Sequence, residues 1–388
     1  MIFSGYKRKQ LYICSMIKRL LIKSIAEVGS LGKAVIILGP RQVGKTTLLN
    51  ELTAGVADKL VLSGDEPDMR ELLSNITSVR LQSLFAGNRV IIIDEAQRIP
   101  DIGITLKLIT DQIPGVQLYV SGSSSLELAS SINEPLTGRK FEYQLYPLSF
   151  GEMVNHHGLI MEKRLLQQRL VFGYYPEVVT NPGSEVRLLK ELASSYLYKD
   201  ILSYGQVKKP VTLDKLLRAL ALQVGNEVSF MELSQMVGAD KETIERYIDL
   251  LEKAFIVLKV NALSRNVRNE IKKGKKIYFW DNGVRNAIIG NFLPWENRLD
   301  KGASWENFII MERVKHLSYQ GFYGNIYFWR TTQNQEIDLI EEKDGSFSVF
   351  EFKVSSLKVP RIPVTFSKAY PVAAYKVIHP ETVEEILQ

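Results

Sequence analysis

A chain of 388 residues that is 45% hydrophobic and 24% charged has the composition of an ordinary globular protein, which excludes disorder as its main character. Its length exceeds that of an average domain, so we expect two or three cores. The single cysteine, Cys14, excludes an intramolecular disulfide, and the four histidines form no cluster with it that could hold structural zinc.

The net charge of +6 is a weak indication of a nucleic-acid partner, because the first 28 residues hold six lysines and arginines against one glutamate. No apolar run approaches the length of a membrane span, and Lys18, Arg19 and Lys23 interrupt the apolar core that a signal peptide needs. We therefore expect a cytoplasmic protein without a membrane partner.

The first 150 residues alternate short apolar strips with amphipathic stretches, which is the pattern of βαβ units. The strips are apolar throughout, as in the strands of a parallel sheet that helices cover on both faces. This pattern predicts an α/β domain over residues 1–150. Its predicted strands are residues 34–38, 60–62, 90–93, 116–120 and 140–145.

The rest of the chain begins with helical spacing, and we interpret residues 151–207 as a lid-like helical extension. Three short helices and a strand follow, an order typical of a winged helix-turn-helix, which we place at 208–262 with residues 241–253 as its recognition helix. A later helix and a run of strands predict a second, small α/β domain over residues 263–388. The predicted elements are helices at 213–222, 230–237, 241–253 and 304–319, and strands at 255–260, 326–330, 336–340, 347–352 and 373–377.

The pattern G-x-x-x-x-G-K-T occupies residues 39–46, directly after an apolar strand and before a stretch that favours a helix. Its glycines allow backbone N–H groups to converge on a phosphate, to which the helix adds its dipole and Lys45 a positive charge. Thr46 would supply a hydroxyl to Mg²⁺. The motif predicts an ATP site formed by Gly39, Pro40, Arg41, Gln42, Val43, Gly44, Lys45, Thr46 and Thr47.

Two acidic residues, Asp94 and Glu95, follow the buried strand at 90–93 and lie at the carboxyl edge of the sheet, where ligands bind in open α/β folds. Asp94 would hold Mg²⁺, and Glu95 would orient and deprotonate the water that attacks the γ-phosphate. The pair favours ATP hydrolysis over nucleotide storage. A small-molecule kinase is disfavoured, because no separate site for an acceptor substrate is evident.

Ser123 follows the next strand, among hydroxyls within reach of a γ-phosphate, and is our candidate for a phosphate sensor. A serine-rich turn is equally an ordinary connection between elements. Arg139 precedes the fifth strand and could offer a cation to the transition state, from its own subunit or from a neighbouring one, or be a surface charge. A ring or dimer is implied if it acts in a neighbouring subunit.

These motifs resemble those of the AAA+ (archaeal-ATPase-type) P-loop ATPases of bacteria and archaea. The resemblance is carried by residues 39–46, 93–97, 122–125, 136–139 and 146–152, and further by residues 172–177 and 278–283. It implies that the ATPase module is joined to a winged-helix segment and to a C-terminal domain of undetermined function that is similar to PD-(D/E)xK nucleases.

Near the C-terminus, Asp338 lies in one predicted strand, and Glu351 and Lys353 lie in the next. Residues two apart in a strand share a face, so a hairpin can bring Asp338 opposite this pair, and Glu306 from the preceding helix could complete the shell. The order is similar to the PD-(D/E)xK pattern, in which carboxylates hold Mg²⁺ and a lysine assists the attack of water on a phosphodiester. A cross-strand ion pair explains the same residues.

Residues 265–276 hold six cations against one acid and could reach nucleic-acid phosphates. The recognition helix itself mixes Lys241 and Arg246 with three acidic residues, and a winged helix can also dock proteins. Our leading hypothesis is an ATP-driven switch that acts on DNA. The alternative is an ATPase whose last domain is a non-catalytic docking module for a partner protein.

Overall fold

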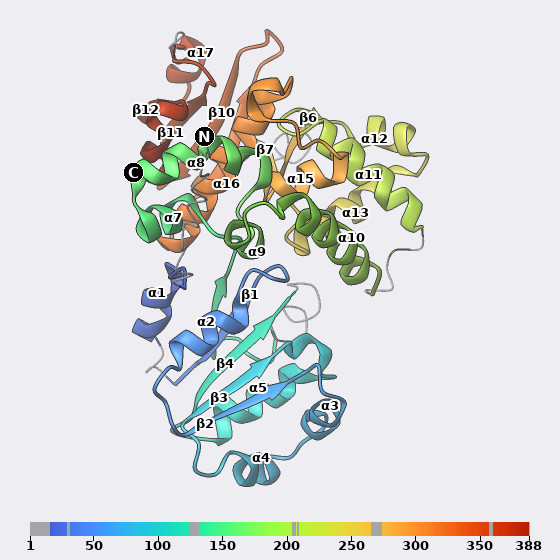
Figure 1. The fold of residues 1–388 in the computed structure, drawn as a ribbon, viewed down its shortest axis with the longest axis vertical. Coiled ribbons are helices and arrows are strands. Elements are labelled where there is room, and N and C mark those ends of the chain that lie inside the picture. Colours follow the sequence, from blue (N-terminus) through green and yellow to red (C-terminus); the bar gives the residue numbers. More distant parts are fainter. Residues whose placement is uncertain are drawn as a thin grey trace, which may run out of the picture.

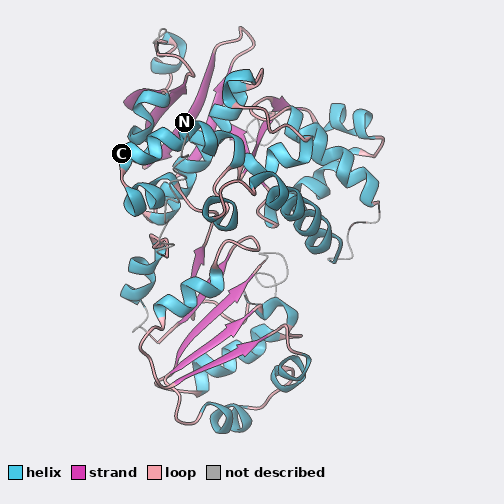
Figure 2. Ribbon diagram, viewed as in Figure 1, coloured by secondary structure: helices cyan, strands magenta, loops and turns pink. Residues whose placement is uncertain are grey.

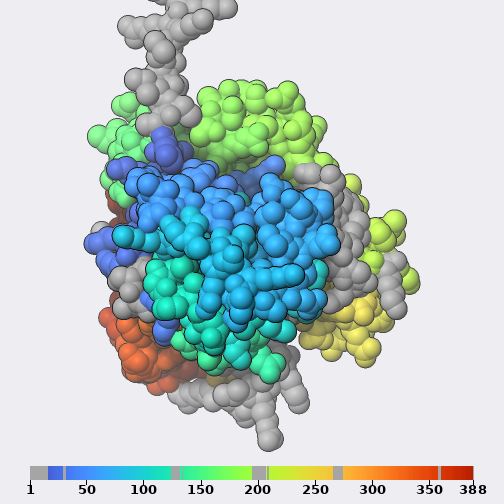
Figure 3. Space-filling model, turned by 90° about the horizontal axis from the view of Figure 1, so that it is seen from below, coloured from blue at the N-terminus to red at the C-terminus, as the bar shows by residue number. Residues whose placement is uncertain are grey.

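The computed structural model describes residues 16–28, 32–123, 132, 134–203, 207, 209–264, 274–356 and 360–387. These residues form two α/β bodies, one built on each of two sheets (Figure 1). Seen from below, the N-terminal body covers the front of the molecule, and later parts of the chain surround its rim (Figure 3). Within the described ranges, no helix has the length and apolar character to cross a membrane.

The N-terminal body contains a parallel sheet with the strand order β2-β3-β4-β1-β5. Helices lie on both sides of this sheet (Figure 2), which confirms the predicted fold class and explains why β1 and β3 are apolar along their length. The strands are β1 (Ala34–Leu38), β2 (Lys59–Ser63), β3 (Val90–Asp94), β4 (Gln117–Gly122) and β5 (Lys140–Gln144). The helices are α1 (Leu21–Val28), α2 (Lys45–Leu52), α3 (Pro67–Leu73), α4 (Ser78–Phe85), η1 (Ala96–Arg98) and α5 (Ile102–Gln112).

The strand order decides which loops meet. Strand β4 separates β1 from β3, so the loop after β1, the end of β3 and the end of β4 come together at one edge of the sheet. This is the carboxyl edge, where α/β sheets bind their ligands.

A helical region connects the two bodies. Capping residues set several of its helix starts: Ser149 and Glu152 form a capping box at α7, while Ser229 and Asp240 accept hydrogen bonds at the starts of α12 and α13. The helices are α7 (Phe150–His157), α8 (Leu159–Phe172), α9 (Pro176–Thr180), α10 (Glu185–Ser203), α11 (Pro210–Leu222), α12 (Phe230–Val237), α13 (Lys241–Lys253) and α15 (Asn282–Ile289). The three helices of the predicted winged helix-turn-helix segment correspond to α11, α12 and α13.

The second body contains a mixed seven-stranded sheet with the order β12-β11-β10-β9-β7-β8-β6. The long helix α16 packs against β8 and β11. The strands are β6 (Glu227–Val228), β7 (Val257–Ala262), β8 (Lys275–Phe279), β9 (Asn325–Arg330), β10 (Glu336–Lys343), β11 (Ser346–Phe352) and β12 (Val372–Ile378). The remaining helices are η2 (Trp295–Asn297), α16 (Lys301–Tyr319), α17 (Val364–Ser367) and η3 (Pro380–Leu387).

The second sheet crosses the boundary that the sequence predicts between residues 262 and 263. Strand β7 pairs with β8 in antiparallel and with β9 in parallel orientation, and the N–H of Leu263 donates to the carbonyl of Phe328 at 2.7 Å. Strands of the predicted winged-helix segment and of the predicted C-terminal domain therefore belong to one sheet.

Candidate functional site

The loop after β1 has the backbone conformation of a phosphate-binding loop. Gln42 and Gly44 both adopt positive φ angles, of 60° and 93°, and α2 begins directly afterwards at Lys45. Turns of this kind gather N–H groups into an anion-binding concavity. The buried side chain of Lys45 donates to the carbonyls of Gly39 at 3.0 Å and Pro40 at 2.8 Å, so its ammonium lies inside the loop.

Gly39 occupies the tightest position of this loop. A Cβ atom at residue 39 would lie 2.1 Å from the carbonyl oxygen of Leu145, at the end of β5. The N–H of Leu145 also donates to the carbonyl of Leu38 at 2.7 Å, which fixes the two chains side by side. The first glycine of the motif is therefore required by the close approach of a neighbouring strand.

Hydroxyl and carboxylate groups meet beside the loop, at the end of β3. The hydroxyl of Thr46 donates to Asp94 Oδ2 at 2.7 Å, while Asp94 Oδ1 accepts from the hydroxyl of Ser121 and from the N–H of Glu95. Oxygen ligands of this kind suit Mg²⁺. Thr46 and Asp94 therefore fit the predicted metal role, and Ser121, which the sequence analysis did not select, orients the carboxylate.

Glu95 is held by a residue that sequence reasoning overlooked, Gln97. The amide of Gln97 donates to Glu95 Oε2 at 2.6 Å and to the hydroxyl of Ser123 at 2.8 Å. Its Oε1 is buried and has no hydrogen-bond partner among the described residues. The predicted base and the predicted sensor are thus joined by one side chain that keeps a free acceptor. Ser124 and Ser125, from the same motif, lie outside the described residues.

Arg139 lies at the opposite edge of the sheet. It precedes β5, its carbonyl accepts the N–H of Ala34 at 2.9 Å, and its guanidinium pairs with Asp111 at 2.6 Å. Ala34 begins β1, whereas the phosphate loop follows the end of this strand. The expectation that Arg139 reaches the site of its own subunit is wrong for this reason. A role in a neighbouring subunit stays a prediction.

The hairpin of β10 and β11 brings Asp338, Glu351 and Lys353 together. The ammonium of Lys353 lies 2.8 Å from Glu351 Oε2 and 3.3 Å from Asp338 Oδ2, which also accepts the N–H of Phe352 at 2.7 Å. Both carboxylates are buried, and burial and the neighbouring Asp338 raise the pKa of Glu351 to about 7. The lysine thus offsets a pair of carboxylates that repel each other.

Glu306 is occupied by other partners. Its Oε1 accepts from the ammonium of Lys276 at 3.0 Å and from the hydroxyl of Tyr278 at 2.6 Å, and Lys276 also lies 2.7 Å from Glu336. Over the part of the chain that the structure describes, no group of three or more His, Cys, Asp or Glu residues is arranged to hold a metal ion. The predicted metal shell of Glu306, Asp338 and Glu351 is therefore not assembled among these residues, and Glu306 is paired with Lys276.

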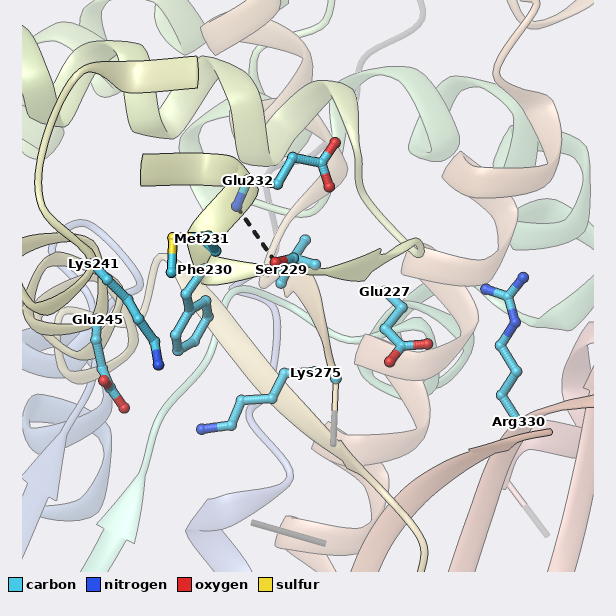
Figure 4. A pocket seen from close by; sticks show the side chains of 11 residues that line it. Glu227, Ser229, Phe230, Met231, Glu232, Lys241, Glu245, Lys275 and Arg330 are labelled. Carbon is cyan, nitrogen blue, oxygen red and sulfur yellow. Dashed lines mark hydrogen bonds between the residues drawn. The ribbon is translucent and has the colours of Figure 1, made fainter. Parts of the chain in front are cut away.

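A cavity of about 650 Å³ lies between helices α12 and α13 and the second sheet (Figure 4). The ammonium groups of Lys241 and Lys275 extend into the same space beside the ring of Phe230, and Lys275 Nζ lies 5.4 Å from the centre of that ring. Glu232 points away from this space, whereas Glu245 lies beside Lys241. Of the basic run at 265–276, residues 265–273 lie outside the described residues.

Three family models match parts of the chain. Residues 31–154 match the model of the AAA domain, residues 163–294 match a domain of unknown function (DUF8612), and residues 301–385 match another domain of unknown function (DUF4143). The first match and the phosphate loop together show a P-loop ATPase module of the AAA type, which implies nucleotide binding.

Known relatives extend over most of the chain. An uncharacterized protein of Mycobacterium tuberculosis is 28% identical over 326 residues, which are 83% of this chain and 70% of the relative. An uncharacterized protein of Methanocaldococcus jannaschii is 22% identical and covers 79% of this chain and 72% of its own. Among solved structures, the Walker-type ATPase of Pyrococcus abyssi is 15% identical, covers 72% of this chain and 97% of its own, and has a TM-score of 0.48.

Substitution of Gly39 by alanine tests the contact between the loop and β5. We expect Gly39→Ala to lower the free energy of unfolding by about 1–3 kcal/mol and to weaken nucleotide binding, because the added Cβ would displace the Leu145 backbone. Gly302→Ala is the control, since a Cβ there meets open space within α16. Chemical denaturation and nucleotide titration measure both variants. Equal behaviour of the two would contradict the interpretation.

Proposed function

We propose that the protein is a Mg²⁺-dependent ATPase that works as a switch acting on nucleic acid. The observation that carries this proposal is the grouping of Lys45, Thr46, Asp94 and Glu95 at one edge of the parallel sheet, with Glu95 held in place by Gln97. The AAA-domain match over residues 31–154 supports the nucleotide part of the proposal. The nucleic-acid part is supported by Lys241 of α13 and Lys275 of β8, which extend into one cavity (Figure 4).

Hydrolysis would proceed by attack of water on the γ-phosphate. The N–H groups of the loop bind the phosphates, and Lys45 exchanges its two loop carbonyls for phosphate oxygens. When bound at Thr46 and Asp94, Mg²⁺ supplies positive charge to the phosphate oxygens. Glu95 accepts a proton from the water as the new P–O bond forms and the bond to the β-phosphate oxygen breaks, which yields ADP and phosphate.

Gln97 would hold the attacking water. Its Oε1, which has no hydrogen-bond partner within the described ranges, would accept one water proton, next to the carboxylate of Glu95 that receives the other. Because the same amide group bonds Ser123, a change at the γ-phosphate reaches the end of β4 through one side chain. This arrangement supports the proposed sensor role of Ser123.

The cavity beside α12 is the proposed place of contact with nucleic acid. Lys241 and Lys275 would bind phosphates, and the ring of Phe230 offers a face on which a base can stack. The proposed winged helix would thus bind nucleic acid next to the second sheet.

One observation favours the alternative, in which the last domain only docks a partner. Glu306, the third carboxylate that a nuclease would use for metal, is paired with Lys276 and accepts from the hydroxyl of Tyr278. We therefore include no cleavage step in the proposed function. In this alternative, the C-terminal domain, which is similar in residue order to PD-(D/E)xK nucleases, would bind a partner protein and would not cleave nucleic acid.

Replacement of Glu95 separates hydrolysis from binding. We expect Glu95→Gln to lower the rate of ATP hydrolysis by about 10²–10⁴-fold with nearly unchanged ATP affinity, because the base is lost and the loop is intact. Lys45→Ala should lose affinity as well. The exposed Glu71→Gln is the control. Steady-state phosphate release and calorimetric ATP titration measure these effects, and full activity of Glu95→Gln would contradict the assignment.

Nucleic-acid stimulation of the ATPase tests the second half of the proposal. We expect single- or double-stranded DNA to raise ATP turnover, and the double variant Lys241→Ala/Lys275→Ala to lose most of this rise while its basal turnover is retained. Weaker binding in higher salt should accompany the effect, since each phosphate contact releases counterions. Exposed Lys215→Ala on α11 is the matched control. No stimulation by any DNA form would favour the docking alternative.

The carboxylate cluster is tested by supercoiled plasmid with Mg²⁺ or Mn²⁺. We expect no nicking, and we expect Asp338→Asn to lower the free energy of unfolding by about 1–3 kcal/mol, because Lys353 and the N–H of Phe352 lose a buried charged acceptor. Asp344→Asn, in the exposed turn between β10 and β11, is the control. Nicking that Asp344→Asn retains and Asp338→Asn abolishes would restore the nuclease interpretation.

A further inference from the structure

Arg19, directly before α1, is a buried arginine with four partners from distant parts of the chain. Its Nε pairs with Glu152 at 2.9 Å, and both side chains are almost fully enclosed, at 6% and 0% exposure. Burial works against the charge, but Glu152 and the Tyr319 hydroxyl outweigh this effect and raise the pKa of Arg19. A buried guanidinium with this many acceptors is a fixed structural element.

One contact of Arg19 reaches the phosphate loop. Its NH1 donates to the carbonyl of Val43 at 2.7 Å. In a trans peptide the carbonyl and the next N–H point in opposite directions, so this bond turns the N–H of Gly44 away from Arg19. Gly44 lies directly before Lys45, where the N–H groups of the loop face the phosphate. Arg19 thus fixes a peptide whose orientation decides phosphate binding.

The opposite side of the guanidinium contacts the second body. Its NH2 donates to the carbonyl of Tyr146 at 2.6 Å and to the hydroxyl of Tyr319, in the last turn of α16, at 3.4 Å. The N–H of Tyr146 approaches the same hydroxyl at 3.4 Å, and the Tyr146 ring stacks on Trp280 at 4.4 Å. A single side chain therefore joins the phosphate loop to α16 and to the end of β8.

We infer that Arg19 is a positioning residue for the nucleotide site and the link through which the nucleotide state reaches α16. The inference rests on the proposed ATP binding at the phosphate loop. When phosphate fixes the peptide of Val43 and Gly44, Arg19 transmits the change to Tyr146 and Tyr319. Because coupling between two equilibria is reciprocal, the factor by which bound ATP shifts the state of α16 is also the factor by which that state of α16 shifts ATP affinity.

The experiment compares ATP affinity and amide exchange in variants of the full chain. The double variant Arg19→Met/Glu152→Gln removes both charges of the buried pair, so that no uncompensated charge remains. Tyr319→Phe removes only the hydroxyl, and Lys18→Ala changes the exposed neighbour of Arg19 as the control. Calorimetry with Mg-ATP gives the affinity, the melting temperature without nucleotide reports folding, and hydrogen exchange with mass spectrometry follows α16.

We expect the double variant to bind Mg-ATP about tenfold more weakly, which corresponds to the loss of about one oriented hydrogen bond to the phosphates. Tyr319→Phe should bind Mg-ATP with a smaller loss and should show no ATP-dependent change in the exchange of α16, whereas the wild type and Lys18→Ala show one. Arg19→Lys should recover part of the Mg-ATP affinity that the double variant loses, because a lysine can still donate to the carbonyl of Val43. This recovery would further support the inference.

Two results would overturn the inference. One is a folded double variant with ATP affinity within about twofold of the wild type, which is near the error of the method. The other is an ATP-dependent change of α16 that Tyr319→Phe leaves intact. If the double variant does not fold, Arg19→Lys and Tyr319→Phe decide by the same criteria. A wild type that binds no Mg-ATP would instead refute the proposed function.

Discussion

The two bodies meet around the buried charge of Arg19. A guanidinium taken out of water is stable only when its donors find acceptors, and these come from Val43 in the phosphate loop, Tyr146 after β5, Glu152 in α7 and Tyr319 in α16. A large movement of any of these elements would leave a buried donor of Arg19 without its acceptor. The same requirement fixes the entry of α7, because Glu152 also caps that helix at Ser149.

Local sequence patterns were sufficient for most of the fold. The apolar strips at 34–38 and 90–93 correspond to β1 and β3, and the predicted helices at 230–237 and 241–253 correspond to α12 and α13. These elements could be predicted because hydrophobic periodicity and capping residues are local signals. Strand β8 was missed. Its first two residues are lysines, and Lys276 is buried only because Glu306 and Glu336, distant in sequence, supply its partners.

The site shows the same difference between local and distant information. Thr46 and Asp94, which the sequence predicts to hold Mg²⁺, lie in contact, because motif spacing and strand ends determine their positions. Gln97 lies in the motif at 93–97, but the sequence predicts no function for it. Its contact with Ser123 forms only because the fold brings the two residues side by side. The prediction for Arg139 was wrong because a residue that precedes a strand of a parallel sheet lies at the amino edge, opposite the loop that follows β1.

The continuous second sheet has a consequence for how this chain can be divided. Strand β7 lies between β8 and β9, so a fragment ending at residue 262 would lose both of its partners, and a fragment beginning at 263 would expose the edge of β9. Open strand edges invite pairing with other chains and aggregation. The smallest fragment that keeps this sheet intact therefore runs from β6 to β12 and includes the helices between these two strands.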